Sequence, residues 1–377
     1  MTVLTNAEIV LADRVITGTL VIANGLITEI TPGTHPTGID CAGDYLIPGI
    51  VDLHTDNLER QVLPRSNARW PSRSALLAHD AQCAIAGVTT VFDALCLGDS
   101  LDNQRHQTFV DGMRDLRDLA DTGALKAEHF LHLRCELPAA DLPALLDSAI
   151  GDPRTRLLSV MDHSPGVGQF ADLEKYRAMR RHDGHTEDAI TAMIERLTDA
   201  QSRFTRPNRA AVLERARTSA VPIASHDDRT TGEIARNHDE GIAIAEFPVT
   251  REAAAAARAC GMSIIAGAPN IVRGGSHSGN VAAIDLIRDR LVDALASDYV
   301  PAAMLEAAFA CAHIGACTGA CTLAEAIALI TANPAAMVGL TDRGRLAPGQ
   351  RADLIRVHLH ETHPIVRAVW RAGDRVA

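Results

Sequence analysis

The chain has 377 residues, of which 47% are hydrophobic and 22% are charged. It is therefore too long for one small domain and apolar enough to bury a full core, so we expect one large domain with a minor one. The formal net charge of -11 and an aromatic content of only 3% argue against a nucleic-acid partner and an anionic membrane surface. No apolar run is long enough for a membrane helix, and residues 1–18 carry charged side chains where a signal peptide would be apolar. We expect a cytoplasmic protein that binds neither membrane nor nucleic acid.

Short apolar runs at both ends of the chain predict β-strands. Near the start they cover residues 7–11, 18–22 and 26–30, and Asn24-Gly25 between the last two predicts a tight hairpin. Near the end they cover residues 349–357, 365–370 and 373–376. The two ends could pair into one small β-domain made of residues 1–46 and 340–377. Alternatively, each end forms an edge hairpin and the two share no sheet.

Between the two ends, strand-like runs alternate with longer helix-like stretches. Eight such runs cover residues 47–54, 89–95, 129–136, 157–163, 221–226, 242–247, 263–266 and 292–298. Strand–helix alternation implies parallel pairing, and eight repeats suggest closure of the sheet. We therefore expect an α/β fold in which residues 47–339 form a (β/α)8 TIM-like barrel. The charged stretch 167–208 is expected to hold two helices, and a lid over the site is one open role for it.

Polar residues collect at the carboxyl ends of these strands, where barrel enzymes keep their sites. On the first strand His54 and Asp56 share one parity, so both should point the same way at the strand's end. An imidazole nitrogen and a carboxylate oxygen suit Zn²⁺ or Mn²⁺. Alone, the His-x-Asp spacing is a weak signal, because the same residues also occur in surface turns.

Other strand ends carry residues of the same kind. His132, Arg134 and Glu136 share one face of the third strand, and three polar residues on a buried strand are costly unless paired or coordinated. Further candidates are Asp162 and His163 after the fourth strand, His226, Asp227 and Asp228 after the fifth, and Asp298 after the eighth. Taken singly, each could simply cap the next helix. Together they indicate a site for two metal ions with Glu136 between them, although the sequence leaves open whether one or two ions are bound.

Two segments resemble a known superfamily. The run Ile47-Pro48-Gly49-Ile50-Val51-Asp52-Leu53-His54 resembles the first barrel strand of the amidohydrolase superfamily. The run Thr331-Ala332-Asn333-Pro334-Ala335, with Gly344-Arg345-Leu346 and Ala352-Asp353-Leu354-Ile355 after it, resembles that superfamily's closing segment. The resemblance runs from end to end and implies a metal-dependent hydrolase.

A narrower resemblance rests on the His54-Thr55-Asp56 spacing, since most of the superfamily has His-x-His there. With Leu133-Arg134-Cys135-Glu136, Met161-Asp162-His163-Ser164-Pro165-Gly166 and Arg273-Gly274-Gly275-Ser276-His277-Ser278-Gly279-Asn280, it is similar to the PhnM-type enzymes of carbon–phosphorus lyase pathways. That family hydrolyses α-D-ribose 1-methylphosphonate 5-triphosphate to the 5-phosphate and diphosphate. The resemblance implies that Asp298 handles the proton and that the metal ligands are His54, Asp56, Glu136, His163 and His226.

A small anionic, phosphorylated substrate needs groups that bind phosphate. The glycines of the loop 273–280 would let its backbone approach a phosphate closely, and Arg273, Ser276, His277 and Ser278 add donors. The bland alternative is a barrel loop that needs glycine to turn. Further substrate candidates are Arg65, Lys175 and Tyr176, while Arg134 either binds a phosphonate or pairs with a carboxylate inside the barrel.

Other functions remain open at the level of sequence. A cyclic amide hydrolase or a deaminase would share the barrel and the metal, although the His-x-Asp spacing and the Gly/Ser/His loop speak against both. A scaffold that had lost its chemistry should also have lost ligands, yet each matched position carries a competent residue. We expect Zn²⁺, with Mn²⁺ as the alternative, and a homo-oligomer.

Overall fold

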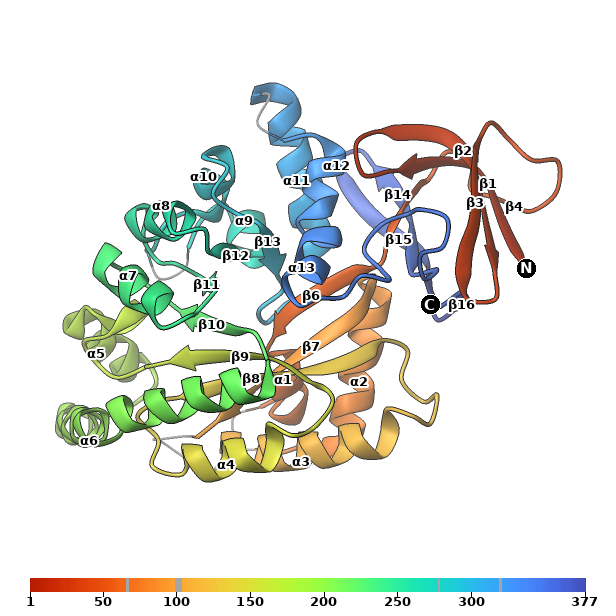
Figure 1. Cartoon of the computed structure of the whole chain (residues 1–377). Helices are drawn as coiled ribbons and strands as arrows, with labels where there is room; N and C mark the ends of the chain where they lie inside the picture. Colours follow the sequence, from red (N-terminus) through yellow and green to blue (C-terminus); the bar gives the residue numbers. More distant parts are fainter. Residues whose placement is uncertain (66–67, 99–103, 277–278, 319–320) are drawn as a thin grey trace.

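The computed structural model of the chain describes residues 1–65, 68–98, 104–276, 279–318 and 321–377. Two eight-stranded sheets organise them. One contains strands from both ends of the chain and lies beside the other, which is parallel and flanked by helices (Figure 1). The fold class expected from the alternation of strands and helices is thus confirmed.

The terminal sheet joins the first and last strands of the chain. Its strands are β1 (Thr2–Val10), β2 (Val15–Ala23), β3 (Leu26–Pro32), β4 (Ile39–Asp40), β5 (Tyr45–Pro48), β14 (Leu354–His360), β15 (His363–Arg371) and β16 (Asp374–Arg375). The two ends meet where β14 pairs antiparallel with β5, so the alternative of two separate hairpins is excluded. The Asn24-Gly25 turn has both residues at positive φ, as a two-residue hairpin loop between twisted strands requires.

The parallel sheet contains the eight strands expected from the sequence. They are β6 (Ile50–Thr55), β7 (Val88–Leu97), β8 (Glu128–Glu136), β9 (Thr155–Met161), β10 (Ile223–His226), β11 (Ile244–Glu246), β12 (Ser263–Gly267) and β13 (Ala294–Ala296). One prediction was wrong in detail: residues 47–54 do not form a single strand. Gly49 divides this run, because its N–H donates to the Asp353 carbonyl and the chain passes there from the terminal sheet into the barrel.

Helices follow most barrel strands and cover the outside of the sheet. They are α1 (Asn57–Val62), α2 (Ser72–Ile85), α3 (Gln104–Leu119), α4 (Leu142–Ala149), α5 (Leu173–His182), α6 (Glu187–Ser219), α7 (Thr231–Asp239), α8 (Arg251–Ala259), α9 (Ala268–Val272), α10 (Ala283–Arg288), α11 (Ala303–Thr318), α12 (Leu323–Ala328) and α13 (Ala332–Met337), with a 3₁₀ turn at Gly168–Phe170. The two helices expected in 167–208 are α5 and α6, and α6 continues beyond that stretch. Whether this segment acts as a lid stays a prediction.

Apolar side chains separate into layers that fit this architecture. A cluster inside the barrel draws on strands around the ring and includes Val51, Phe92 and Phe130. A larger cluster lies between the strands and the helices, and a third packs within the terminal sheet around Trp370. Residues of alternate parity on one strand thus face different cores, which explains why these strands are apolar on both faces.

The seam between β6 and β13 closes the barrel and shapes the site. Asp56 N–H donates to the Asp298 carbonyl at 2.6 Å, and Asp298 N–H donates to the His54 carbonyl at 3.0 Å. The buried Asp52 carboxylate adds to the seam by accepting from the N–H of Ser297 at 3.1 Å. Between Asp52 and Thr55 the register of β6 against β7 shifts, so strict alternation of side chains does not hold at this strand's end.

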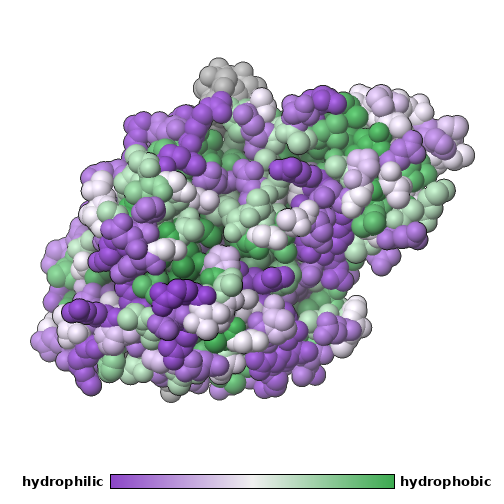
Figure 2. Space-filling view, in the orientation of Figure 1, coloured by the Kyte–Doolittle hydropathy of each residue, from purple (hydrophilic) through white to green (hydrophobic). Residues whose placement is uncertain are grey.

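Among the described residues, no helix is long and apolar enough to cross a bilayer. Hydrophilic and hydrophobic residues are interspersed over the face in view in Figure 2. Exposed large apolar side chains of the terminal sheet include Val15, Leu26 and Ile39.

Candidate metal centre and substrate cavity

Backbone geometry at three strand ends turns side chains into the barrel mouth. Asp227, Phe247 and Asp298 follow β10, β11 and β13, and all three have φ near +55°. A left-handed conformation is uncommon for residues other than glycine, and for a bulky residue such as Phe247 it is a true outlier. Such strain persists where the surrounding structure holds it in place, and it often accompanies function.

Asp56 stands at the N-cap position of α1 but does not cap the helix. Its side chain makes no capping hydrogen bond to the described backbone. Instead Asp56 Oδ1 accepts from Arg134 Nη1 at 2.6 Å and lies 3.6 Å from His54 Nε2. Burial alone would raise the pKa of Asp56, but Arg134 and His54 outweigh it and hold the pKa well below its usual range. The carboxylate is therefore charged and directed into the site, and the helix-cap alternative does not hold for it.

Glu246, at the end of β11, fixes the orientation of two histidines. Its Oε1 lies 2.8 Å from His54 Nδ1 and its Oε2 lies 2.7 Å from His226 Nδ1. Both rings also pack edge-on against Phe247, with ring centroids 5.0 Å and 5.6 Å away. With Nδ1 held by a carboxylate, each ring has Nε2 left for another partner. Histidines that bind metals commonly have this carboxylate partner on the second nitrogen.

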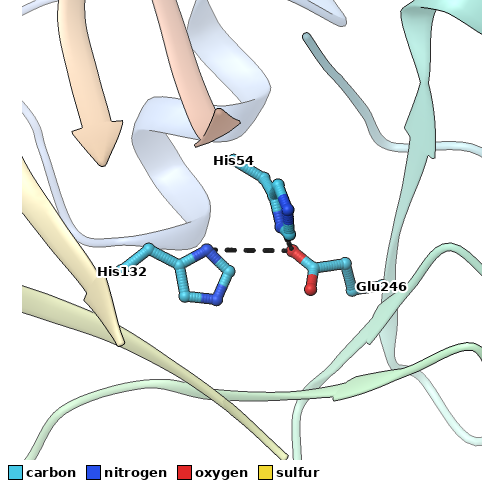
Figure 3. Close-up of side chains that lie close together, drawn as sticks. All are labelled: His54, His132 and Glu246. Atoms are coloured by element: carbon cyan, nitrogen blue, oxygen red, sulfur yellow. Dashed lines mark hydrogen bonds and ion pairs between the residues drawn. The ribbon is translucent and has the colours of Figure 1, made fainter. Parts of the chain in front are cut away.

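His132, in the middle of β8, lies beside His54 and Glu246 (Figure 3). Its Nδ1 is 2.9 Å from the Leu53 carbonyl and 3.9 Å from Glu246 Oε1. Its Nε2 is buried and has no hydrogen-bond partner among the described residues. Burial outweighs the attraction of Glu246 and lowers the pKa of His132 to about 3. The ring is therefore neutral, which is the form that binds metals.

A second pair of residues lies at the ends of β8 and β9. Glu136 Oε2 lies 2.6 Å from His163 Nδ1, and Glu136 Oε1 accepts from the His163 backbone N–H at 2.9 Å. In the structure Glu136 therefore contacts His163, and its expected position between two metal ions stays a prediction. The carboxylate that joins two histidines from different strands is Glu246. The His163 and His226 rings approach edge to face at 5.6 Å.

Two groups of ligand-type residues lie at the barrel mouth, in addition to the group of His54, His132 and Glu246. His54, Asp56 and Asp298 each offer a ligand atom within 4.8 Å of the others, and so do His163, His226 and Asp227. Burial and the nearby Asp56 carboxylate raise the pKa of Asp298, because a second negative charge close to Asp56 is unfavourable. Of the five ligands predicted from the sequence, four belong to these groups, and Glu136 contacts a member of the second.

The donor set fits a divalent cation. It combines neutral-capable imidazoles with carboxylates, which suits Zn²⁺ and Mn²⁺. The rings of His54, His226 and His163 are each held through Nδ1 by a carboxylate, and the orphaned nitrogen of His132 lies in the same region of the barrel. A buried polar set of this kind is costly without a cation to balance it.

A cavity of about 610 Å³ opens from these residues across the barrel mouth. Arg134 lines it beside the metal-ligand candidates, and Arg105, at the start of α3, lies next to Arg134 and 3.6 Å from Glu59. Arg273, after α9, lines another part of the wall together with Ser276. The cavity is large enough for a nucleotide-sized ligand.

The remaining substrate candidates have different positions. Lys175 Nζ lies 3.7 Å from where a Cβ atom would stand at Gly279, so this lysine reaches the loop 273–280. Tyr176 is buried, and its hydroxyl donates to Met193 Sδ rather than lining the cavity. Arg65 is exposed and does not line the cavity either. His277 and Ser278 lie outside the described residues.

Sequence reasoning missed Glu246 and Arg105 as residues of the site, and it named Asp227 only as a strand-end candidate, not among the metal ligands. Glu246 left a signal, because it is the only charged residue in the run Ile242-Ala243-Ile244-Ala245-Glu246-Phe247. A carboxylate in a buried strand needs a partner, so it could have been selected on the same ground as Glu136. Arg105 left none, since an arginine in the amphipathic stretch of α3 is the usual pattern of a solvated helix face.

Comparison with known proteins shows one matching family and several relatives. The amidohydrolase family model matches residues 160–377. The chain is 41% identical over 378 residues to the α-D-ribose 1-methylphosphonate 5-triphosphate diphosphatase of Escherichia coli strain K12, covering 99% of this chain and 100% of that protein. It is 27% identical over 390 residues to an adenine deaminase of Nitratidesulfovibrio vulgaris strain Hildenborough, covering 100% of this chain and 57% of that protein.

Solved structures show the same fold at lower identity. The dihydropyrimidinase of Brevibacillus agri superposes with a TM-score of 0.67 at 12% identity, covering 99% of this chain and 94% of that one. The N-acetyl-D-glucosamine-6-phosphate deacetylase of Mycobacterium smegmatis superposes with a TM-score of 0.63 at 16% identity, covering 100% of both chains. At such identities the likeness shows the fold alone.

Proposed function

This chain belongs to the amidohydrolase family, and from that premise we propose that it is a metal-dependent diphosphatase of ribose 1-methylphosphonate 5-triphosphate. The products would be the corresponding 5-phosphate and diphosphate. The observation that carries the proposal is the position of ligand-type residues between two positively charged parts of one cavity.

The two positive parts lie on opposite sides of the barrel. Arg134 lies on β8, the third strand of the sheet, and Arg105 lies on α3, which follows β7, the second strand. Arg273 follows β12, the seventh strand, and strands three and seven of an eight-membered ring face each other across its axis. The substrate named for the E. coli relative carries a phosphonate at one end of the sugar and a triphosphate at the other. A cavity with arginines at both ends fits a molecule that has an anionic group at each end.

The residues of the chain divide the work as follows. Arg273, Lys175 and the loop 273–280 would hold the triphosphate, and Arg134 with Arg105 would hold the phosphonate. The ligand-type residues between them would hold a divalent ion, which would supply Lewis-acid chemistry. Asp298, which offers a carboxylate oxygen within 4.8 Å of ligand atoms of His54 and Asp56, would accept the proton of the attacking water. Glu246 keeps His54 and His226 in a fixed orientation, so the site does not need to reorganise during the reaction.

Products identified by phosphorus NMR test the proposal. Enzyme reconstituted with metal is incubated with the ribosyl phosphonate triphosphate in ¹⁸O-labelled water, and adenine and a cyclic imide are offered in parallel. We expect diphosphate, with the label on one product showing which phosphorus is attacked. Turnover of adenine or the imide without release of diphosphate would favour a deaminase or cyclic amide hydrolase and overturn the proposal.

Substitution of Arg273 tests the phosphate end of the cavity. Arg273→Ala should lower kcat/KM for the triphosphate by 10-fold or more, since charge-assisted bonds are worth about 1.5–3 kcal/mol. Metal content should stay unchanged, because Arg273 belongs to neither ligand group. Arg217→Ala, on the exposed far end of α6, is the matched control. An equal kcat/KM for the triphosphate in Arg273→Ala and in the control would show that Arg273 does not bind the phosphate groups.

Finer properties accompany the proposal. We propose Zn²⁺ as the native metal with Mn²⁺ as the alternative, a cytoplasmic location and a homo-oligomeric state. Elemental analysis of protein purified without added metal measures the first, and sedimentation measures the last. Two ions per chain would assign one to each ligand group, whereas one ion would leave one group for substrate or proton transfer.

A further inference from the structure

A second network of buried charged residues lies outside the cavity, between helix α2 and strands β7 and β8. Asp93 Oδ1 lies 2.7 Å from His79 Nε2, and Asp93 Oδ2 lies 2.8 Å from His129 Nδ1. His129 Nε2 lies 3.1 Å from Asp80 Oδ1. All four residues are buried, and the proposed chemistry uses none of them.

The hydrogen bonds of this network fix where its protons lie. Asp80 accepts from the backbone N–H groups of Lys126 and Ala127, so it is an ionised acceptor. His129 stands between two carboxylates and must donate from both ring nitrogens. His79 donates through Nε2 to Asp93, which leaves His79 Nδ1 as an acceptor.

The side chain of Asn57 donates a hydrogen bond to the Nδ1 atom of His79. Asn57 Nδ2 donates to His79 Nδ1 at 2.9 Å and to Gln82 Oε1 at 2.9 Å. Asn57 is the first residue of α1 and directly follows Asp56. The network thus runs from Asp80 through His129, Asp93 and His79 to the residue next to a candidate metal ligand.

We propose that this network positions Asp56 for the metal, with His79 and Asn57 as positioning residues. The inference rests on the proposed function, because it assumes a metal at Asp56. The Asp56 backbone is held on one side by Asp298 across the barrel seam. On the other side, the Asn57 side chain ties the start of α1 to α2, and through His79 to β7 and β8. A rotation of Asp56 would break hydrogen bonds in a buried network, which is costly.

Two substitutions at His79 test its two hydrogen bonds separately, the one to Asn57 and the one to Asp93. Asparagine can imitate Nδ1 and so keep the bond to Asn57, whereas glutamine can imitate Nε2 and so keep the bond to Asp93. We expect His79→Gln to raise the metal dissociation constant by about 10–100-fold, as loss of an orienting partner does. His79→Asn should keep most of the affinity. Cys83→Ala, one turn along α2 and also in contact with His79, is the matched control for a buried substitution.

The readouts are metal affinity by competition with a chelator, the visible spectrum of the Co²⁺-substituted protein, and thermal stability. A role in packing alone would lower stability in both His79 variants and leave the dissociation constant at the wild-type value, which would overturn the inference. If the His79 variants do not fold, Gln82→Ala removes the second acceptor of Asn57 at an exposed residue. An unchanged dissociation constant in Gln82→Ala would then overturn it.

The outcome for the wild-type protein separates this inference from the proposed function. If the wild-type protein binds metal and releases diphosphate, and His79→Gln leaves the metal dissociation constant unchanged, only the positioning role is overturned. If the wild-type protein binds no metal, both the positioning role and the proposed function are overturned.

Discussion

At the scale of single residues, Glu246 contacts two of the proposed metal ligands, His54 and His226. Its two oxygens each hold one histidine through Nδ1. Glu246→Gln has one amide oxygen and one amide nitrogen, so it can accept from only one ring and must face the other with a donor. We expect metal affinity to fall about 10–100-fold, measured as metal retained against a graded series of chelator-buffered solutions.

The matched control is Glu252→Gln, which makes the same change on the exposed face of α8. Equal retention of metal in the two variants would show that Glu246 does not orient the ligands.

His129 predicts how stability depends on pH. Burial lowers its pKa, but Asp93 and Asp80 outweigh burial and raise the pKa to about 9, above the value of about 6.5 in an unfolded chain. A raised histidine pKa stabilises the fold fully below the unfolded value, and this contribution is lost as pH rises toward 9. It is on the order of 3 kcal/mol.

Urea unfolding of metal-loaded protein between pH 6 and 9.5 measures this contribution. The free energy of unfolding of the wild type should fall across that window, whereas His129→Gln, although less stable overall, should show a flatter dependence. Parallel curves for the two proteins would contradict the raised pKa.

Residue patterns could predict most of the ligand-type side chains but not their pairing. His54, Asp56, His163 and His226 are recognisable because they are polar residues at the ends of apolar strands. The position of Glu136 on His163 and the role of Glu246 depend on contacts between residues far apart in sequence. His54 and Glu246 are 192 positions apart, and no local pattern contains such a contact.

At the scale of elements, Gly49 controls the passage from the terminal sheet into the barrel. A Cβ atom there would lie 2.2 Å from Thr89 Oγ1 and 3.0 Å from Asp353 Cβ, so something must shift. We expect Gly49→Ala to lower the free energy of unfolding by about 1–3 kcal/mol, which chemical denaturation measures. Gly151→Ala, where a Cβ atom would meet nothing within 4 Å, is the control. A loss no larger than that of the control would show that the junction adjusts freely.

The strands and the terminal hairpins were predictable because their apolar runs are short and bounded by turn residues. Element boundaries were less predictable. The run at 47–54 is continuous in hydropathy, yet it serves two sheets, because its first half pairs with β14. Strict alternation along β6 predicted that His54 and Asp56 lie on one side. The structure has a register shift between Asp52 and Thr55, so alternation alone does not describe the end of this strand.

At the scale of the whole molecule, a charged cluster joins the two sheets. Glu128, at the start of β8, binds Arg343 at 2.6 Å and also binds Arg351, which in turn pairs with Asp353 just before β14. Glu128→Gln leaves two poorly exposed guanidinium groups with less negative charge. We expect a loss of about 2 kcal/mol, less than for a fully buried pair because Glu128 is partly exposed.

The two tryptophans allow this loss to be located. Trp370 is buried in the terminal sheet and Trp70 is exposed, so Trp70→Phe leaves one reporter of that sheet. In that background, Glu128→Gln should make the fluorescence transition precede the loss of far-ultraviolet circular dichroism. Glu361→Gln, on the exposed turn after β14, should not. Coincident transitions at the unshifted midpoint would show that the cluster does not join the sheets.

The pairing of β5 with β14 also sets the order in which a growing polypeptide can fold on the ribosome. All eight barrel strands emerge from the exit tunnel before β14 does, so the catalytic ring can close while the terminal sheet is still incomplete. Until β14 has emerged, β5 has an open edge directly next to the first barrel strand. A nascent chain stalled before that point would present this edge to chaperones or to other nascent chains.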